Sequence, residues 1–203
     1  EKRAALMKKT ETAVEDEVKK ANKELLQKIP DYLLAAMEVP AHADSKALDT
    51  MAGERKLVGL PLSRWSKFLK ENAGGALFAP WDALAALPKD AFETEAAALI
   101  DRWKNAPPEG TPPALLEEFA RKPPKTLQEA ARLYGDLCAQ TAASLEKRPA
   151  DSTAPLENPV QEAMRAALFT ESAPGRLSRT EVEKTHSRKV FEARSKVKDE
   201  LNL

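Results

Sequence analysis

The chain is poor in the residues on which most protein chemistry depends. Its 203 residues include one cysteine, two histidines and seven glycines. No apolar run approaches the roughly 20 residues that a membrane-spanning helix needs. A single cysteine excludes an intrachain disulfide, a CxxC pair and a CxxCH haem-attachment motif. The sequence therefore predicts no disulfide scaffold, no membrane span and no covalently bound cofactor.

An excess of charge of either sign is also missing. Lysine and arginine total 32, aspartate and glutamate total 32, and the formal net charge is zero. Proteins that bind nucleic acid usually carry a basic stripe, because phosphate neutralisation drives their affinity. Here the two signs are interleaved, which is typical of solvated helix faces. We expect no nucleic-acid partner.

Strand signals are absent as well. The chain has no alternating pair of segments joined by Asn-Gly or Asp-Gly, the usual hairpin turn. Alanine, leucine, glutamate and lysine, which favour helices, are abundant. The 15 prolines stand where helices would begin or end. These features predict an all-α protein.

The two ends of the chain read as long, charged helices. Residues 2–29 form one predicted helix, interrupted at Pro30, whose ring clashes with the preceding turn. Its apolar residues repeat at seven in two rows offset by four: Met7, Val14, Ala21 and Val18, Leu25, Tyr32. A capping box at Ser178 and Glu181 begins a second helix, with a stripe of Val182, Val190, Val197 and Leu201. We predict that residues 1–39 and 178–203 pair as an antiparallel coiled-coil stalk.

Residues 40–177 are richer in aromatic side chains and are predicted to form a compact multi-helix head on that stalk. Three helix starts are indicated by possible caps: Asp90 with Glu93, Thr111 before two prolines, and Thr126 with Glu129. Further helices are expected at 45–55, 61–71, from 80, and at 160–169. The whole chain reads as one helical domain, a fragment of a larger multidomain protein, because ends that emerge together suit an inserted domain.

Few residues are candidates for catalysis or metal binding. His42 lies in a predicted loop and His186 on a charged helix, and neither has a partner at ligand spacing. Cys138 follows Leu137 on an apolar helix face, which predicts a buried, unreactive thiol. The carboxylates of Glu117 with Glu118, and of Glu93 with Glu95, read as surface charges. The sequence therefore predicts no catalytic, cofactor-binding or metal-binding residues.

Two groups of side chains have a structural and a functional interpretation. Trp65, Trp81 and Trp103 lie on apolar helix faces, so they are expected in the core, but an exposed indole could stack on a sugar ring. Arg132 and Tyr134 are expected to form a buried polar brace, with a binding face as the alternative.

Five segments carry a resemblance to a known family. They are DYLLAAMEV (31–39), LSRWSKFL (62–69), LFAPWDALAALP (77–88), TLQEAARLYGDL (126–137) and ENPVQEAMRAALFTESAPGRLS (157–178). Their order and spacing resemble a helical insert in secreted planctomycete and verrucomicrobial proteins with an N-terminal cytochrome c domain. That insert lies between two domains of unknown function. The resemblance implies an extracytoplasmic setting, neighbouring domains as partners and a haem domain elsewhere in the parent chain.

The sequence is compatible with three functions. The first is a non-catalytic structural or interaction module that spaces or docks the neighbouring domains. The second is a carbohydrate-binding module that uses an exposed tryptophan in a polysaccharide-processing protein. The third, an independent enzyme, needs a cluster of titratable groups in a cleft, which the sequence does not indicate.

Overall fold

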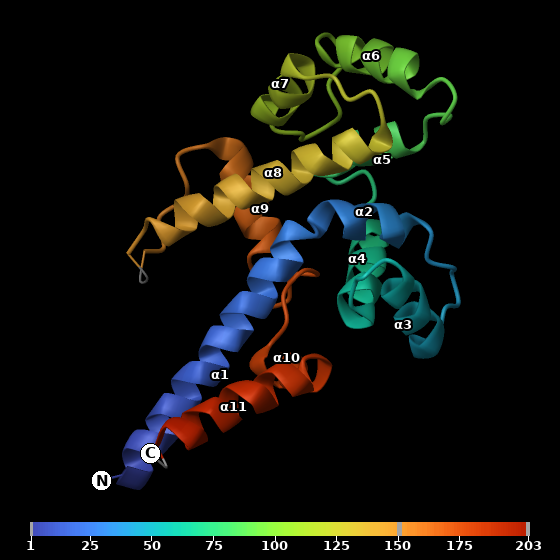
Figure 1. Ribbon diagram of the computed structural model, residues 1–203. Helices are drawn as coiled ribbons and strands as arrows, with labels where there is room; N and C mark the ends of the chain where they lie inside the picture. Colours follow the sequence, from blue (N-terminus) through green and yellow to red (C-terminus); the bar gives the residue numbers. More distant parts are fainter. Residues whose placement is uncertain (1, 150–151, 202–203) are drawn as a thin grey trace.

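A computed structural model describes residues 2–149 and 152–201, and within these ranges every regular element is an α-helix. The predicted all-α fold is therefore confirmed. The helices, drawn in Figure 1, are α1 (Lys2–Gln27), α2 (Ile29–Met37), α3 (Ser45–Glu54), α4 (Gly59–Glu71), α5 (Ala79–Ala85), α6 (Phe92–Trp103), α7 (Pro113–Arg121), α8 (Leu127–Glu146), α9 (Pro159–Leu168), α10 (Arg179–Thr185) and α11 (Ser187–Leu201).

The first two helices meet at Pro30, as the sequence predicts. α1 ends at Gln27, and Pro30 occupies the first turn of α2. N–H groups in a first turn have no partner within the helix, so the missing N–H of proline costs α2 no hydrogen bond. The chain changes direction there (Figure 1). α2 then packs against α4 and α8, and Tyr32 and Leu33 are fully buried. The predicted stalk segment, residues 1–39, thus includes α2, a helix that lies in the core.

α11 lies alongside α1 and runs back toward its beginning, so both ends of the described chain lie at the same end of the molecule (Figure 1). Buried apolar residues lie on both helices: Val14, Ala21 and Leu25 on α1, and Val190 and Val197 on α11. Met7 continues the heptad row but is 65 % exposed. The side chain of Leu201 lies outside the described part of the structure.

The predicted C-terminal helix is divided in two. His186 ends α10 with backbone angles φ −119° and ψ 32°, and α11 begins at the next residue. The N–H of His186 still bonds to the carbonyl of Val182 at 2.8 Å, which closes the last turn of α10. The apolar stripe is continuous across the break, which is why the sequence pattern does not reveal it.

Tyr134 of α8 is the centre of an aromatic cluster that holds the helical body, α2–α9, together. Its ring stacks on Phe78 at 5.3 Å and meets Trp81 and Phe119 edge-on. Trp103 packs on Phe119, and Trp65 packs on Phe78. The Tyr134 hydroxyl donates a hydrogen bond to the carbonyl of Leu77 at 2.9 Å. Apart from Phe78, which directly precedes α5, these rings come from α4, α5, α6, α7 and α8, so one cluster joins five helices.

The predicted caps are only partly observed. Thr126 accepts the N–H of Glu129, and Ser178 with Glu181 forms a complete capping box. α6 begins at Phe92 without a side-chain cap, two residues after Asp90. Thr111 is buried, its hydroxyl has no partner among the described residues, and α7 begins at Pro113. The prolines at 112 and 113 supply no N–H in the first turn, so a cap at Thr111 has fewer donors to serve.

Candidate functional site

The two histidines hold separate places. His42 is exposed, whereas His186 is half-buried at the corner between α10 and α11. The hydroxyl of Thr185 donates to the carbonyl of Glu181 at 2.7 Å, and its oxygen lies within hydrogen-bond distance of His186 Nδ1, at 2.9 Å. Burial, and then the charge of Lys189, hold the pKa of His186 below its usual value. The contacts of His186 thus follow from its place between the end of α10 and the beginning of α11.

Cys138 is fully buried, as predicted. Its Sγ lies 3.8 Å from the sulfur of Met164, and burial raises the pKa of the thiol to about 12. A nucleophilic cysteine needs a thiolate and access to solvent. Cys138 has neither, so it serves as a small apolar side chain between α8 and α9.

The candidate carboxylates lie on the surface. Glu93 of α6 pairs at 2.8 Å with Lys125 in the connection before α8, and Glu118 pairs with Arg121 within α7. Glu95 and Glu117 are exposed. A carboxyl that acts as a general acid needs an apolar environment that raises its pKa. These four groups have solvent or a cation beside them instead.

All three tryptophans of the chain are buried. Trp65, Trp81 and Trp103 are 0 %, 1 % and 6 % exposed. The predicted role in the core is therefore confirmed, and no indole face is open to a sugar ring. The Nε1 of Trp65 is buried without a partner among the described residues and faces the segment at Gly175.

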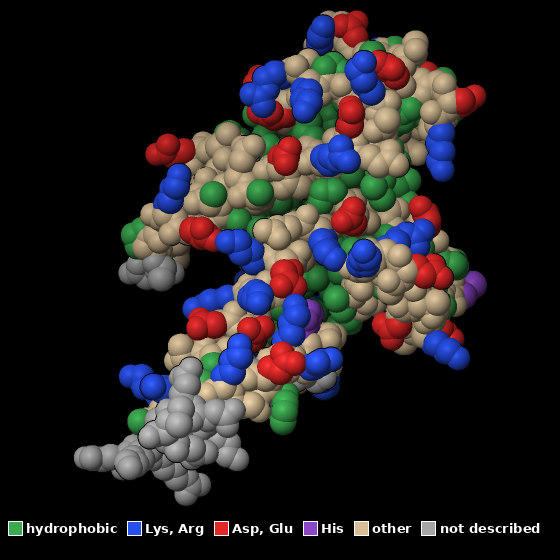
Figure 2. All heavy atoms as spheres, in the orientation of Figure 1, with side chains coloured by type: hydrophobic (Ala, Val, Ile, Leu, Met, Phe, Trp, Pro, Cys, Tyr) green, Lys and Arg blue, Asp and Glu red, His purple; other side chains and the backbone are tan. Residues whose placement is uncertain are grey.

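The structure separates Arg132 from Tyr134. The predicted buried brace of both residues is therefore wrong for Arg132, whereas Tyr134 is buried and its hydroxyl bonds to the carbonyl of Leu77. Arg132 is exposed on the other side of α8, where it borders two shallow grooves. One groove, of about 590 Å³, lies between α1 and α8, where Ala139, Ala142 and Ala143 of α8 form part of its lining. Figure 2 shows this face as a hollow between the two helices.

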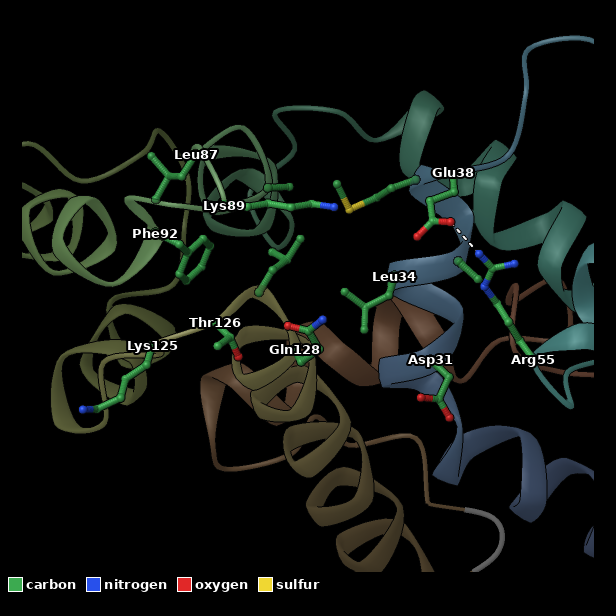
Figure 3. Close-up of a pocket in the computed structure, with 14 residues that line it drawn as sticks. Asp31, Leu34, Glu38, Arg55, Leu87, Lys89, Phe92, Lys125, Thr126 and Gln128 are labelled. Carbon is green, nitrogen blue, oxygen red and sulfur yellow. Dashed lines mark hydrogen bonds and ion pairs between the residues drawn. The ribbon is translucent and has the colours of Figure 1, made fainter.

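A cavity larger than the groove between α1 and α8 lies where α2, the connection from α5 to α6, and the beginning of α8 meet. It is a cleft of about 710 Å³. Leu34, Leu87 and Phe92 contribute apolar surface from three different elements (Figure 3). The other lining residues are Asp31, Ala35, Met37, Glu38, Arg55, Ala85, Lys89, Lys125, Thr126, Leu127 and Gln128. We call this cavity the α2–α8 cleft.

Charged side chains surround the apolar surface of the α2–α8 cleft. Glu38 pairs with Arg55 of the α3 C-terminus at 2.5 Å, and this contact is drawn in Figure 3. Lys125 pairs with Glu93. The cleft therefore combines an apolar interior with a polar rim, the usual composition of a protein-binding surface.

Sequence reasoning did not find the α2–α8 cleft. Its lining comes from residues 31–38, 85–92 and 125–128 together with Arg55, segments that only the packing of α2 against α8 brings together. One available signal was Met37, an apolar residue at the end of a helix, which is 44 % exposed. Exposed methionines are frequent at protein-binding surfaces.

The sequence matches no protein-family model, no curated protein and no solved structure. Within the described residues, no group of three or more histidine, cysteine, aspartate or glutamate side chains is placed to hold a metal ion. In the same part of the chain, no helix is both long and apolar enough to cross a membrane.

Proposed function

We propose that this chain is a non-catalytic helical module that spaces or docks neighbouring domains of a secreted, planctomycete-type cytochrome c-containing protein. In this proposal α1 and α11 form an antiparallel coiled-coil stalk, and the helical body is its head. The setting is extracytoplasmic, the partners are the neighbouring domains, and the haem belongs to another domain of the parent chain.

The observation that carries the proposal is the pairing of α1 with α11. The first turn of α1 and the last turn of α11 lie at one end of the molecule, while α5, α6 and α7 lie at the other (Figure 1). A domain inserted into a longer chain needs its two ends close together, so that the flanking parts are not forced apart. The arrangement meets that need and projects the body away from the chain ends.

Polar contacts accompany the packing of α10 and α11 against α1. Lys189 of α11 lies 3.2 Å from the carboxylate of Glu24 on α1, and Arg179 of α10 pairs with Glu11 of α1. Val14 and Leu25 of α1 are buried, as is Val190 of α11. An apolar seam flanked by opposite charges is the pattern that specifies a coiled coil and the direction of its helices.

The non-catalytic part of the proposal is supported by the condition of the reactive side chains. Cys138 is buried with a raised pKa, His186 is engaged by Thr185, and Glu93 is paired with Lys125. Within the described residues, each of these side chains contacts another part of the chain and does not face an open cleft. The carbohydrate-binding alternative receives no support, because it depends on an exposed indole.

The test is to measure binding and spacing with the neighbouring domains of the parent protein. We expect calorimetric titration of this chain with each purified neighbouring domain to give a saturable signal for at least one. In the parent protein, replacing this chain by a flexible Gly-Ser linker should change energy transfer between fluorophores on the two flanking domains. Absence of binding together with unchanged transfer would contradict the proposal, as would substrate turnover by this chain alone.

A further inference from the structure

The apolar interior of the α2–α8 cleft is unusual on this surface. Elsewhere on the face shown in Figure 2, acidic and basic side chains are interspersed. In the cleft, Leu34, Leu87 and Leu127 are only partly buried, and Met37 at its edge is 44 % exposed. Removing such side chains from water is favourable by about 25 cal/mol per Å². The cleft therefore offers a partner apolar area that the helical body leaves uncovered.

A solvent-exposed ion pair lies at each wall of the cleft. The pair of Glu38 with Arg55 joins the end of α2 to the end of α3, and the pair of Lys125 with Glu93 joins the approach to α8 to α6. Phe92, 5 % exposed, anchors the base. A preformed site loses less conformational entropy on binding than one that must be ordered. The walls belong to helices that pack against one another within the chain, α2 on α8 and α5 on α6 and α8, which favours a preformed site.

Two further charges of the cleft are not used in this way. Lys89, in the connection between α5 and α6, extends into the cleft in Figure 3, and Asp31 lies on the opposite wall, on α2. Neither forms an ion pair within residues 2–149 and 152–201. One wall thus presents a cation without an ion-pair partner. The other presents the carboxylate of Asp31, which lies in the first turn of α2 and also borders the groove between α1 and α8.

A protein helix fits these features better than a small ligand. Small-molecule sites use a few buried polar groups to orient the ligand. The two buried, unpartnered polar atoms of the described residues belong to Trp65 and Thr111, and neither residue lines the cleft. The described elements include no strand whose edge could pair with an extended peptide. An apolar groove between helices binds the apolar face of an amphipathic helix.

We propose that the α2–α8 cleft binds an amphipathic helix of a neighbouring domain, with a carboxylate of that helix against Lys89 and a cation against Asp31. That the helix belongs to a neighbouring domain rests on the proposed function. That it is amphipathic and carries a carboxylate and a cation follows from the residues of the cleft. The apolar face of the bound helix covers Leu34, Met37 and Leu87.

The probes are two fluorescein-labelled, 18-residue helical peptides with leucine at i, i+4, i+7 and i+11. One carries glutamates on a single flank of the leucine stripe, and the other carries arginines there. Lys89→Glu should weaken binding of the glutamate peptide about tenfold and leave the arginine peptide no weaker. Asp31→Lys should do the opposite. Met37→Asp should weaken both, because it places a charge in the apolar strip.

Lys122→Glu, an exposed change outside the cleft, is the matched control and should alter neither affinity. Circular dichroism melting would establish that each variant is folded. The proposal is overturned if neither peptide binds better than its scrambled version, or if the Lys89 and Asp31 variants affect both peptides alike.

A second measurement separates this inference from the proposed function. The same variants are titrated with the neighbouring domains. If those domains bind and Met37→Asp has no effect, the cleft is not the docking site, and the proposed function stands. If the peptides show the expected selectivity but no neighbouring domain binds, the chemistry of the cleft stands, and the helix does not come from those domains.

Discussion

Asn22 of α1 and Leu177, 155 residues away, are joined by two hydrogen bonds through one side-chain amide. The N–H of Leu177 donates to Asn22 Oδ1 at 2.8 Å, and Asn22 Nδ2 donates to the carbonyl of Leu177 at 3.0 Å. The amide thus satisfies both backbone groups of a residue that is only 1 % exposed. It fixes the segment before α10, and therefore the position from which α10 and α11 return along α1.

Replacing Asn22 should consequently cost stability. Asn22→Ala leaves the N–H and carbonyl of Leu177 without partners, and an unsatisfied buried backbone group costs about 1–3 kcal/mol. We expect a loss of about 2 kcal/mol in the free energy of unfolding, because Asn22 is only half-buried. Urea unfolding followed by circular dichroism measures it. Asn72→Ala is the control, because the exposed side-chain amide of Asn72 has one partner among the described residues, the carbonyl of Phe68 in the adjoining helix α4. Equal losses in the two variants would show that the Leu177 contact contributes nothing.

Two helical glycines should respond to alanine in opposite directions. A Cβ at Gly135 of α8 would lie 2.6 Å from Cγ of Pro30, so α2 would have to move away. We expect Gly135→Ala to destabilise the fold by about 1–3 kcal/mol. A Cβ at Gly53 of α3 would meet no atom within 4 Å. Gly53→Ala should stabilise the protein by about 0.5–1 kcal/mol, because alanine favours the helix.

Thermal and urea unfolding of both glycine variants provide the measurement. Gly53→Ala also serves as the control, because the chemical change is the same and only the surroundings differ. Stabilisation by Gly135→Ala would mean that α2 and α8 do not approach as closely as the structure has them.

Trp81 should be essential to the stability of the helical body. It is 1 % exposed and packs edge-on against Tyr134. Truncation of a buried tryptophan to alanine costs about 3–5 kcal/mol, since the transfer energy is lost and a cavity remains. Chemical unfolding of Trp81→Ala measures this loss. Phe191→Ala is the comparison, because Phe191 is 70 % exposed and its removal should change stability by no more than about 0.5 kcal/mol. An unchanged melting temperature for Trp81→Ala would place the indole outside the core.

The two tyrosines should titrate late and together with unfolding. Burial raises the pKa of Tyr32 to about 12, although the N–H of Val58 donates to its hydroxyl at 2.9 Å. Burial also raises the pKa of Tyr134 well above its usual value. Both pKa values exceed the unfolded value of about 10, so the folded state favours the neutral phenols. Their contribution to stability is present below about pH 10. It is lost as the pH rises above 10, through about 12 for Tyr32 and at still higher pH for Tyr134.

Phenolate absorbance and circular dichroism, recorded together from neutral to strongly alkaline pH, check this expectation. In denaturant both tyrosines should ionise near pH 10. In the native protein phenolate should appear only at higher pH, together with loss of the helical signal. Native-like helicity with a phenolate midpoint near pH 10 would mean that the tyrosines are exposed.

Several parts of the fold could be predicted because they depend on residues close in sequence. Pro30 interrupts α1 through its own ring, and Thr126 and Ser178 cap helices that begin at the next residue. Cys138 and the tryptophans are buried because each lies on an apolar helix face. Where a local rule failed, as at Thr111, neighbouring prolines had removed the donors that the cap would serve.

The sequence by itself therefore determined the all-helical class, most helix boundaries and which large side chains leave water. Only the tertiary structure decided that α10 and α11 separate at His186, that Gly135 must accommodate Pro30, and that Asn22 holds Leu177. It also brought Asp31 and Lys89 to opposite walls of one cleft. Helix propensity, capping and periodicity act over a few residues, whereas these relationships join segments distant in sequence. Their geometry follows from how the helices pack, because packing fixes which surfaces meet and which remain open.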